Sequence, residues 1–205
     1  MIDLLDKNEL KNNIDMSKIS VGFAITGSFC THINVIPVLE SLSNRCQKVI
    51  PILSDAASQT DTRFGKAVDL INKIESITGN KIVHSIVSAE PLGPKKLVDA
   101  LIIAPCTSNT LAKIAIGITD STVSMAAKSV IRNENPVILA IATNDGLGNS
   151  AKNIGFLLNV KNIYFVPFGQ DDAKNKPRSI VAHMDLIEQT LNCALKKQQI
   201  QPLLS

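Results

Sequence analysis

The sequence predicts a single α/β domain built on a doubly wound parallel sheet. Short runs of apolar and β-branched residues alternate with segments in which apolar residues recur at helical spacing. The connections are short, and no internal repeat or low-complexity linker interrupts the order. A length of 205 residues with 45% hydrophobic content suits one buried core. We expect the domain to span residues 18–198, after an N-terminal extension over 1–17 and before a C-terminal tail over 199–205.

The first half of the chain contains two units of strand, turn and helix. Residues 19–25 and 49–53 are apolar, β-branched runs, which predict the first two strands. A helix is expected over residues 29–44. A second helix is expected over residues 63–79, where apolar residues recur at helical spacing. It is expected to end at a glycine that suits a left-handed C-terminal cap. Residues 54–62, before that helix, are predicted to form a polar loop.

The second half continues the alternation. Pro105 ends an apolar strand, and helical spacing resumes after four small polar residues. A Lys-rich loop that includes Lys176 precedes the last helix. Further strands are expected at residues 82–83, 101–104, 136–142 and 163–166, and further helices at residues 85–89, 111–118, 121–132, 152–158 and 179–197.

Charge and composition exclude several classes of function. The formal net charge is +3 and no block of about five or more like charges occurs, so neither a nucleic acid nor a membrane surface is expected as a partner. No apolar stretch reaches the roughly 18 residues of a membrane span, and the N-terminus is charged. We therefore expect a cytoplasmic protein without a transmembrane helix or signal peptide. The 4 cysteines are scattered, without histidines at ligand spacing, which indicates reduced thiols and no metal site.

Polar turns follow the predicted strands, and there the chain offers a ligand site. The turn residues are Thr26, Gly27 and Ser28 after the first strand, Thr107, Ser108, Asn109 and Thr110 after the strand at 101–104, and Asn144 after the strand at 136–142. In an open parallel sheet, ligands bind at the carboxyl ends of the strands, where free helix amides suit anionic groups. Helix capping alone is the alternative explanation, since Ser, Thr and Asn are preferred N-cap residues.

The glycines of the first turn match only part of a nucleotide-binding motif. Gly22 and Gly27 have the spacing of a P-loop, but Ser28 and Phe29 stand where that motif needs Lys and then Ser or Thr. No Gly-x-Gly-x-x-Gly occurs, so the dinucleotide fingerprint is absent. A Thr-Gly-Ser turn above a helix N-terminus suits a single phosphate and hence a mononucleotide, with a plain tight turn as the alternative.

The stretch over residues 103–120 resembles the signature of the homo-oligomeric flavin-containing Cys decarboxylase family. The matching residues are Pro105, Asn109, Thr110, Ala112, Lys113, Ile114, Ala115, Gly117 and Asp120, and flavin prenyltransferases of that family share the runs Ala-Pro-Cys and Thr-Leu-Ala. The resemblance implies a Rossmann-like flavoprotein fold, FMN as cofactor, and a homo-oligomer, trimeric or a multiple of it, with flavin sites at subunit interfaces. It also implies that FMN is bound by Thr26, Gly27, Ser28, Ser54, Pro105, Thr107, Ser108, Asn109 and Thr110.

Two departures from the family pattern bear on activity. Arg63 stands where the decarboxylases have a catalytic His, and an always charged guanidinium cannot serve as a general acid or base. It can hold a carboxylate through two parallel hydrogen bonds, and a surface salt bridge is its alternative role. Of the decarboxylases' Pro-Ala-Met-Asn clamp, only the final residue is present, as Asn144. Decarboxylation of a Cys peptide is therefore disfavoured.

Further segments resemble one branch of this family, whose members work together with a different protein. They are residues 26–28, 62–65, 89–95, 125–128, 142–145, 167–172 and 199–203. This resemblance implies an oxidoreductase subunit that works with an NADP-binding partner to convert a dihydropyridine dicarboxylate into its aromatic product. We assign Arg63 and Asn144 to the catalytic site, and name Arg178 and Lys176 as further cations for the substrate carboxylates. The alternatives are a flavin-dependent lyase or prenyltransferase and a non-catalytic interaction subunit.

Overall fold

The structure is a computed structural model that describes residues 14–204. Of the predicted N-terminal extension, residues 1–13 lie outside the described residues. The remainder is packed on the domain, because the short 3-10 helix η2 (Met16–Lys18) buries Met16, which is 8% exposed. Asp15 caps this helix by accepting a hydrogen bond from the Ser17 amide at 3.2 Å.

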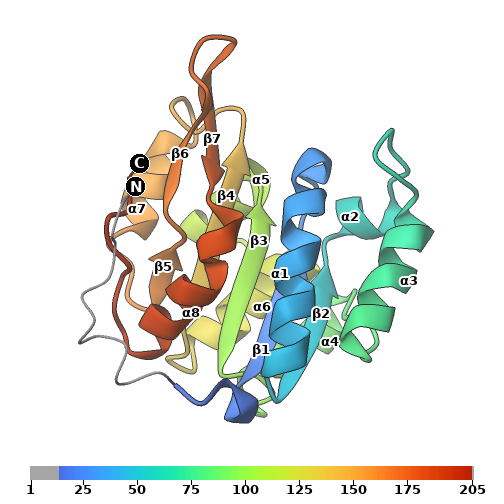
Figure 1. The fold of residues 1–205 in the computed structure, drawn as a ribbon. Coiled ribbons are helices and arrows are strands. Elements are labelled where there is room, and N and C mark those ends of the chain that lie inside the picture. Colours follow the sequence, from blue (N-terminus) through green and yellow to red (C-terminus); the bar gives the residue numbers. More distant parts are fainter. Residues whose placement is uncertain (1–13, 205) are drawn as a thin grey trace.

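Five parallel strands form the centre of the sheet, in the order β2-β1-β3-β4-β5 (Figure 1). Their bounds are β1 Ser20–Ile25, β2 Lys48–Leu53, β3 Ala100–Cys106, β4 Val137–Thr143 and β5 Ile163–Phe165. Val21 marks the register, since it lies beside Val49 on one side and Ala100 on the other. The predicted α/β class and doubly wound parallel sheet are confirmed.

An antiparallel hairpin extends this sheet and replaces part of a predicted helix. Strand β6 (Phe168–Asp172) pairs with β7 (Lys176–Ala182), and β7 pairs with the last two residues of β4. The outer edge of β4 is therefore shared, with β5 along its first half and β7 at its carboxyl end. The predicted helix over 179–197 was wrong for its first part, up to residue 186, and the predicted Lys-rich loop before it was wrong. The chain has the hairpin, a 3-10 turn η5 (Met184–Leu186) and a shorter helix α8 (Ile187–Leu195).

Helices cover both faces of the sheet (Figure 1). On one face, α1 (His32–Arg45), which follows the 3-10 turn η3 (Phe29–Thr31), contacts α3 (Ala67–Thr78) and α8. On the other face, α6 contacts α5 and the turn of α4, and α7 contacts α5. The bounds on that face are α4 Ile86–Ala89, η4 Glu90–Leu92, α5 Ser108–Ile116, α6 Thr122–Ile131 and α7 Ala151–Leu157.

The core lies between these layers and is centred on β3. All seven residues of β3 are buried, as expected for a parallel strand covered on both faces. Leu101, Ile102 and Ile103 are fully enclosed. Glycine is required where η4 meets α6, because a Cβ at Gly93 would lie 1.9 Å from the Ser129 carbonyl oxygen. Within residues 14–204, no helix has the length and apolar character needed to cross a bilayer.

The segment between β2 and α3 differs from its prediction. Residues expected as a polar loop include the short helix α2 (Asp55–Gln59), because the Ser54 hydroxyl accepts the Ala57 amide and caps it. Helix α3 begins at Ala67 rather than near Arg63, since residues 62–65 form a tight turn closed by two hydrogen bonds between Thr62 and Gly65. The left-handed cap at Gly79 is confirmed, with φ +63°.

Candidate functional site

The polar turns predicted from the sequence lie on one edge of the sheet. They follow the carboxyl ends of four parallel strands, β1, β2, β3 and β4, at the upper edge of the sheet in Figure 1. The hairpin and the turn over residues 62–65 rise beside the same edge. This is the edge at which open α/β sheets bind ligands.

Thr26 joins the turn after β1 to the turn after β3. Its hydroxyl donates to the Pro105 carbonyl oxygen at 2.6 Å and accepts the Thr107 amide at 3.2 Å. The residue is 1% exposed, so both bonds are shielded from water. His32 stabilises the same turn, since its Nε2 donates to the Thr26 carbonyl oxygen at 2.8 Å. Burial lowers the pKa of the His32 ring, which favours its neutral form. Thr26 therefore orders the two turns rather than offering a free hydroxyl to a ligand.

The turn after β3 leaves helix amides without their usual partner. Thr107 is the N-cap of α5 but makes no side-chain cap bond, and its hydroxyl donates to Thr110 Oγ1 at 3.3 Å. Helix α6 shows the contrast, since Ser121 caps it with a complete capping box. Helix capping therefore does not account for the Thr107 hydroxyl. The first amides of α5, at Ser108 and Asn109, can serve an anionic or carbonyl-bearing ligand.

The turns after β1 and β2 are adjacent and contribute further donors. The Ser54 amide donates to the Ile25 carbonyl oxygen at 3.1 Å, which holds the two strand ends together. The Ser54 hydroxyl accepts the Ala57 amide at 3.2 Å, so its own proton is free to be donated. Gly27 has no side chain, which leaves its backbone open to a ligand. A Cβ at this position would also lie 3.3 Å from Ala56 Cβ, a tight contact. Two adjacent turns with hydroxyls and a glycine fit a phosphate group.

Arg63 and Asn144 lie at opposite sides of this edge. Arg63 is exposed in the turn beyond the edge strand β2, with its guanidinium 4.9 Å from the centre of the Phe64 ring. Asn144 is exposed and directly follows β4. Strands β1 and β3 lie between them, so the strands that lead to the two residues are about 14 Å apart at a spacing of roughly 4.8 Å per strand. One copy of the chain does not bring the two predicted catalytic residues together.

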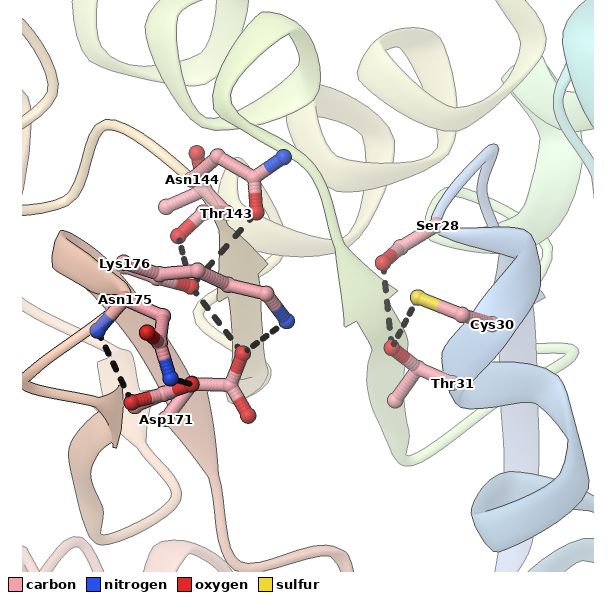
Figure 2. A network of polar contacts seen from close by, with 10 residues as sticks. Ser28, Cys30, Thr31, Thr143, Asn144, Asp171, Asn175 and Lys176 are labelled. Carbon is pink, nitrogen blue, oxygen red and sulfur yellow. Dashed lines mark hydrogen bonds and ion pairs between the residues drawn. The ribbon is translucent and has the colours of Figure 1, made fainter.

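A second wall of the site is formed by the hairpin (Figure 2). Lys176 Nζ pairs with Asp171 Oδ2 at 2.8 Å, and the buried Ser179 hydroxyl lies 3.5 Å from the same Asp171 oxygen. Ser179 also lies 3.5 Å from Asn144 Oδ1 and 3.3 Å from the Thr143 carbonyl oxygen. The hairpin and the end of β4 thus share one chain of polar contacts.

Two cavities lie between helices rather than at these turns. The larger, of about 490 Å³, opens between α1 and α3 and has an apolar wall that includes Ile33, Phe64 and Leu70. The other, of about 360 Å³, lies between α5, α6 and α7. None of the predicted FMN-binding residues lines either cavity.

Cys106, in the run Ala-Pro-Cys, is not a nucleophile. Its side chain is fully buried at the end of β3, and burial raises the pKa of the thiol to about 12. The thiolate is therefore not formed at neutral pH.

Comparisons with known proteins agree with this arrangement. A family model described as Flavoprotein matches residues 9–193. The chain belongs to the Flavoprotein family. It is 50% identical over 184 residues to the second, or B, subunit of dipicolinate synthase from Bacillus subtilis (strain 168), a match that covers 90% of this chain and 92% of that relative. The predicted branch of the family is therefore confirmed as that of the second dipicolinate synthase subunit.

Solved structures of other flavoproteins extend the comparison. The crystal structure of the second dipicolinate synthase subunit from Bacillus halodurans C is 46% identical, with a TM-score of 0.86 over 94% of this chain and 98% of that one. The FMN-dependent cysteine decarboxylase SpaF is 21% identical, with a TM-score of 0.64 over 89% of this chain and 98% of that one. The second likeness shows the flavoprotein fold alone.

Sequence reasoning missed two polar residues of this flavoprotein's site, Asp171 and Ser179. Asp171 lies in the Pro-Phe-Gly-Gln-Asp-Asp segment that resembles the branch, and that segment was the available signal. Ser179 gave no signal, because it was assigned to a helix and is in fact buried in β7.

Proposed function

We propose that the chain is the second subunit of a dipicolinate synthase. It would work with the first, or A, subunit of dipicolinate synthase, an NADP-binding partner, to oxidise dihydrodipicolinate to dipicolinate. The observation that carries the proposal is 50% identity along 92% of a relative named as the second subunit of this enzyme. The lack of a Gly-x-Gly-x-x-Gly motif in this chain supports placing NADP on the partner. The place of action is then the cytoplasm of the mother cell in a sporulating bacterium.

FMN is the cofactor that best fits the turns. The phosphate would be held by Gly27, Ser28 and Ser54, which stand in adjacent turns because the Ser54 amide bonds the Ile25 carbonyl oxygen at the end of β1. The uncapped start of α5, from Thr107 to Thr110, would face the ring, with Pro105 and Thr26 fixing the geometry behind it. A bound flavin supplies a ring that accepts a hydride. The chain's own residues bind and orient the reactants, and formation of the aromatic ring provides much of the driving force.

The substrate carries two carboxylates, which require donors and cations. Arg63 can hold one of them through two parallel hydrogen bonds, and Asn144 can donate to the other from the far side of the edge. Because the two residues stand apart in one copy, Arg63 would serve the site of a neighbouring copy. This agrees with a homo-oligomer, a trimer or its multiple, and with large apolar side chains exposed near Arg63 such as Ile33, 77% exposed, and Phe64, 55% exposed.

Two alternatives predict different outcomes of the same experiment. A flavin-dependent decarboxylase or prenyltransferase on this fold is opposed by Arg63, which cannot donate or remove a proton as a histidine does. A non-catalytic interaction subunit would keep the fold without the flavin.

The test is anaerobic reconstitution of this chain with the first dipicolinate synthase subunit and NADP, with and without FMN, while dipicolinate formation is followed. The expected result is a yellow protein that co-purifies with the first subunit and forms dipicolinate faster when FMN is present. A colourless protein that takes up no added FMN would refute the flavin assignment. Failure to co-purify, with turnover of a decarboxylation substrate, would refute the synthase.

Arg63→Ala is expected to weaken dipicolinate binding by about tenfold while FMN content is kept, because a charge-assisted hydrogen-bond pair is lost. Arg63→Lys keeps the charge but not the two parallel bonds, so it should recover only part of the affinity. Arg132→Ala is the matched control, since Arg132 pairs with Glu90 on the α6 face. Loss of FMN without loss of dipicolinate affinity would contradict the assignment of Arg63.

A further inference from the structure

The β6–β7 hairpin carries an ammonium group on a support of polar contacts. Lys176 Nζ is held at 2.8 Å by Asp171 Oδ2, and this carboxylate raises the pKa of Lys176, which keeps the side chain charged. Asp172, beside it, is occupied elsewhere, because it accepts the backbone amide of Asn175 at 3.0 Å and its side-chain amide at 2.8 Å to close the turn. Asp171 is therefore the acid that orients Lys176.

Ser179 connects this ion pair to the body of the protein. It is 1% exposed, and its hydroxyl lies within 3.5 Å of oxygens from Asp171, Asn144 and the Thr143 backbone. A buried hydroxyl has few alternative partners, so its contacts hold the neighbouring side chains in fixed positions. The hairpin base is fixed to β4 by the pairing of Ala142 with Val181 and of Thr143 with Ile180, the two residues that directly follow Ser179.

Lys176 is exposed, with 56% of its side chain accessible, and its ammonium lies on the side of the hairpin that faces the strand ends. In Figure 2 its ammonium extends from the hairpin toward Ser28 and Cys30, which stand on the opposite side of the end of β3. An ammonium has three N–H donors, and Asp171 uses one, so others remain for an anion.

Arg178, the other cation predicted on this segment, is placed differently. Its Cδ and Nη1 lie 3.6 and 3.8 Å from the position of a Cβ at Gly148, so its side chain lies over the turn after β4. Of the two predicted hairpin cations, Lys176 is the one that pairs with Asp171, whose carboxylate lies beside the Ser179 hydroxyl.

We propose that Lys176, oriented by Asp171 and Ser179, binds one carboxylate of the dicarboxylate substrate and thereby selects for a second carboxylate on the ring. The inference rests on the proposed function and adds a specificity-determining residue to it. Lys176 is the binding group, while Asp171 and Ser179 are positioning residues. The same ammonium could in chemical terms contact a phosphate, so the test separates these two anions.

The experiment is calorimetric titration of the FMN-loaded full chain with pyridine-2,6-dicarboxylate and with pyridine-2-carboxylate, together with a separate titration of flavin-free protein with FMN. Lys176→Met should weaken binding of the dicarboxylate by about tenfold, in line with a charge-assisted hydrogen bond, and binding of the monocarboxylate by much less. The affinity for FMN should stay the same. Lys174→Met, which removes a neighbouring lysine of the same turn, is the matched control and should change neither.

Ser179→Ala tests the support. It should reduce the preference for the dicarboxylate by roughly threefold, since the positioning of Lys176 is lost but not its charge. Ser179→Thr, which keeps the hydroxyl, should restore the preference. Ser129→Ala is the stability control, because Ser129 is equally buried and makes two hydrogen bonds, to the Glu90 carbonyl oxygen and from the Gly93 amide, far from the hairpin.

The outcomes separate the two proposals. Dicarboxylate binding that is unchanged in Lys176→Met would overturn this inference and leave the proposed function standing. Loss of FMN affinity in that variant, with dicarboxylate affinity kept, would assign the ammonium to the phosphate and also overturn it. Wild-type protein that binds no pyridine dicarboxylate would also overturn this inference, while reconstitution with the first subunit tests the proposed function separately.

Discussion

The Thr26 hydroxyl should stabilise both the fold and the flavin site, and Thr26→Val tests this with little change in side-chain volume. The substitution removes the partner of the Pro105 carbonyl oxygen and of the Thr107 amide at a position that is 1% exposed. An unsatisfied buried polar group costs about 1–3 kcal/mol, so we expect the free energy of unfolding to fall by about 2–4 kcal/mol. For a chain of this size, a loss of about 3 kcal/mol lowers the melting temperature by about 6–12 °C.

The assay combines urea unfolding with FMN titration. Thr26→Val should weaken FMN binding by roughly tenfold, which is about 1.4 kcal/mol of binding free energy. The reason is that FMN must then order the two turns when it binds. Thr26→Ser keeps the hydroxyl and should bind FMN as the wild type does. Thr190→Val is the matched control, since Thr190 is 0% exposed and its hydroxyl donates one turn back, to the Leu186 carbonyl oxygen at the start of α8, at 2.8 Å.

The reasoning would be refuted if Thr26→Val and Thr190→Val unfolded at the same urea concentration and bound FMN equally well. Thr26 would then be an ordinary buried threonine, and the two turns would be ordered by the strands alone. Weaker FMN binding in Thr26→Ser would point instead to the lost methyl group.

Three further predictions concern a cap, a close contact and a thiol. Ser54→Ala and Ser121→Ala each remove an N-cap and should each cost about 1 kcal/mol in urea unfolding, but only Ser54→Ala should also weaken FMN binding; equal FMN affinity would remove Ser54 from the site. Gly93→Ala should destabilise the chain by about 1–3 kcal/mol or more, because the new Cβ would meet the rigid Ser129 carbonyl oxygen, and an unchanged melting temperature would contradict the observed packing. Burial raises the pKa of Cys106 to about 12 from an ordinary value of 9.0, so its contribution to stability is complete below pH 9, where both states keep the proton, and is lost as the pH rises toward 12. Cys106→Val should flatten that alkaline decline in thermal unfolding, and an equally steep decline would contradict the assignment.

The parallel sheet could be predicted because its strands are buried on both faces and therefore appear as continuous apolar runs. The hairpin could not. Ile180, Met184, Ile187 and Leu191 recur at spacings of three and four, which fits a helix, while pairing with β6 and the end of β4 decides the conformation of the first of them. Tertiary pairing of this kind leaves no periodic signal in so short a segment.

The turns of the site could be predicted, but not how each polar group is used. Thr26 and Thr107 are 81 positions apart in sequence, and only the fold shows that they bond to each other. In the same way, Arg63 and Asn144 belong to one predicted site by resemblance, while the strand order separates them.

The separation of Arg63 from Asn144 has a consequence for mixed oligomers. If the neighbouring copy supplies Arg63, a protein altered at Arg63 and another altered at Asn144 each bind the dicarboxylate weakly when assembled alone. Once the two are dissociated and reassembled together, some interfaces combine an intact Arg63 from one variant with an intact Asn144 from the other, so the mixture should bind the dicarboxylate more tightly than either variant alone. A chain that carries both alterations should rescue neither.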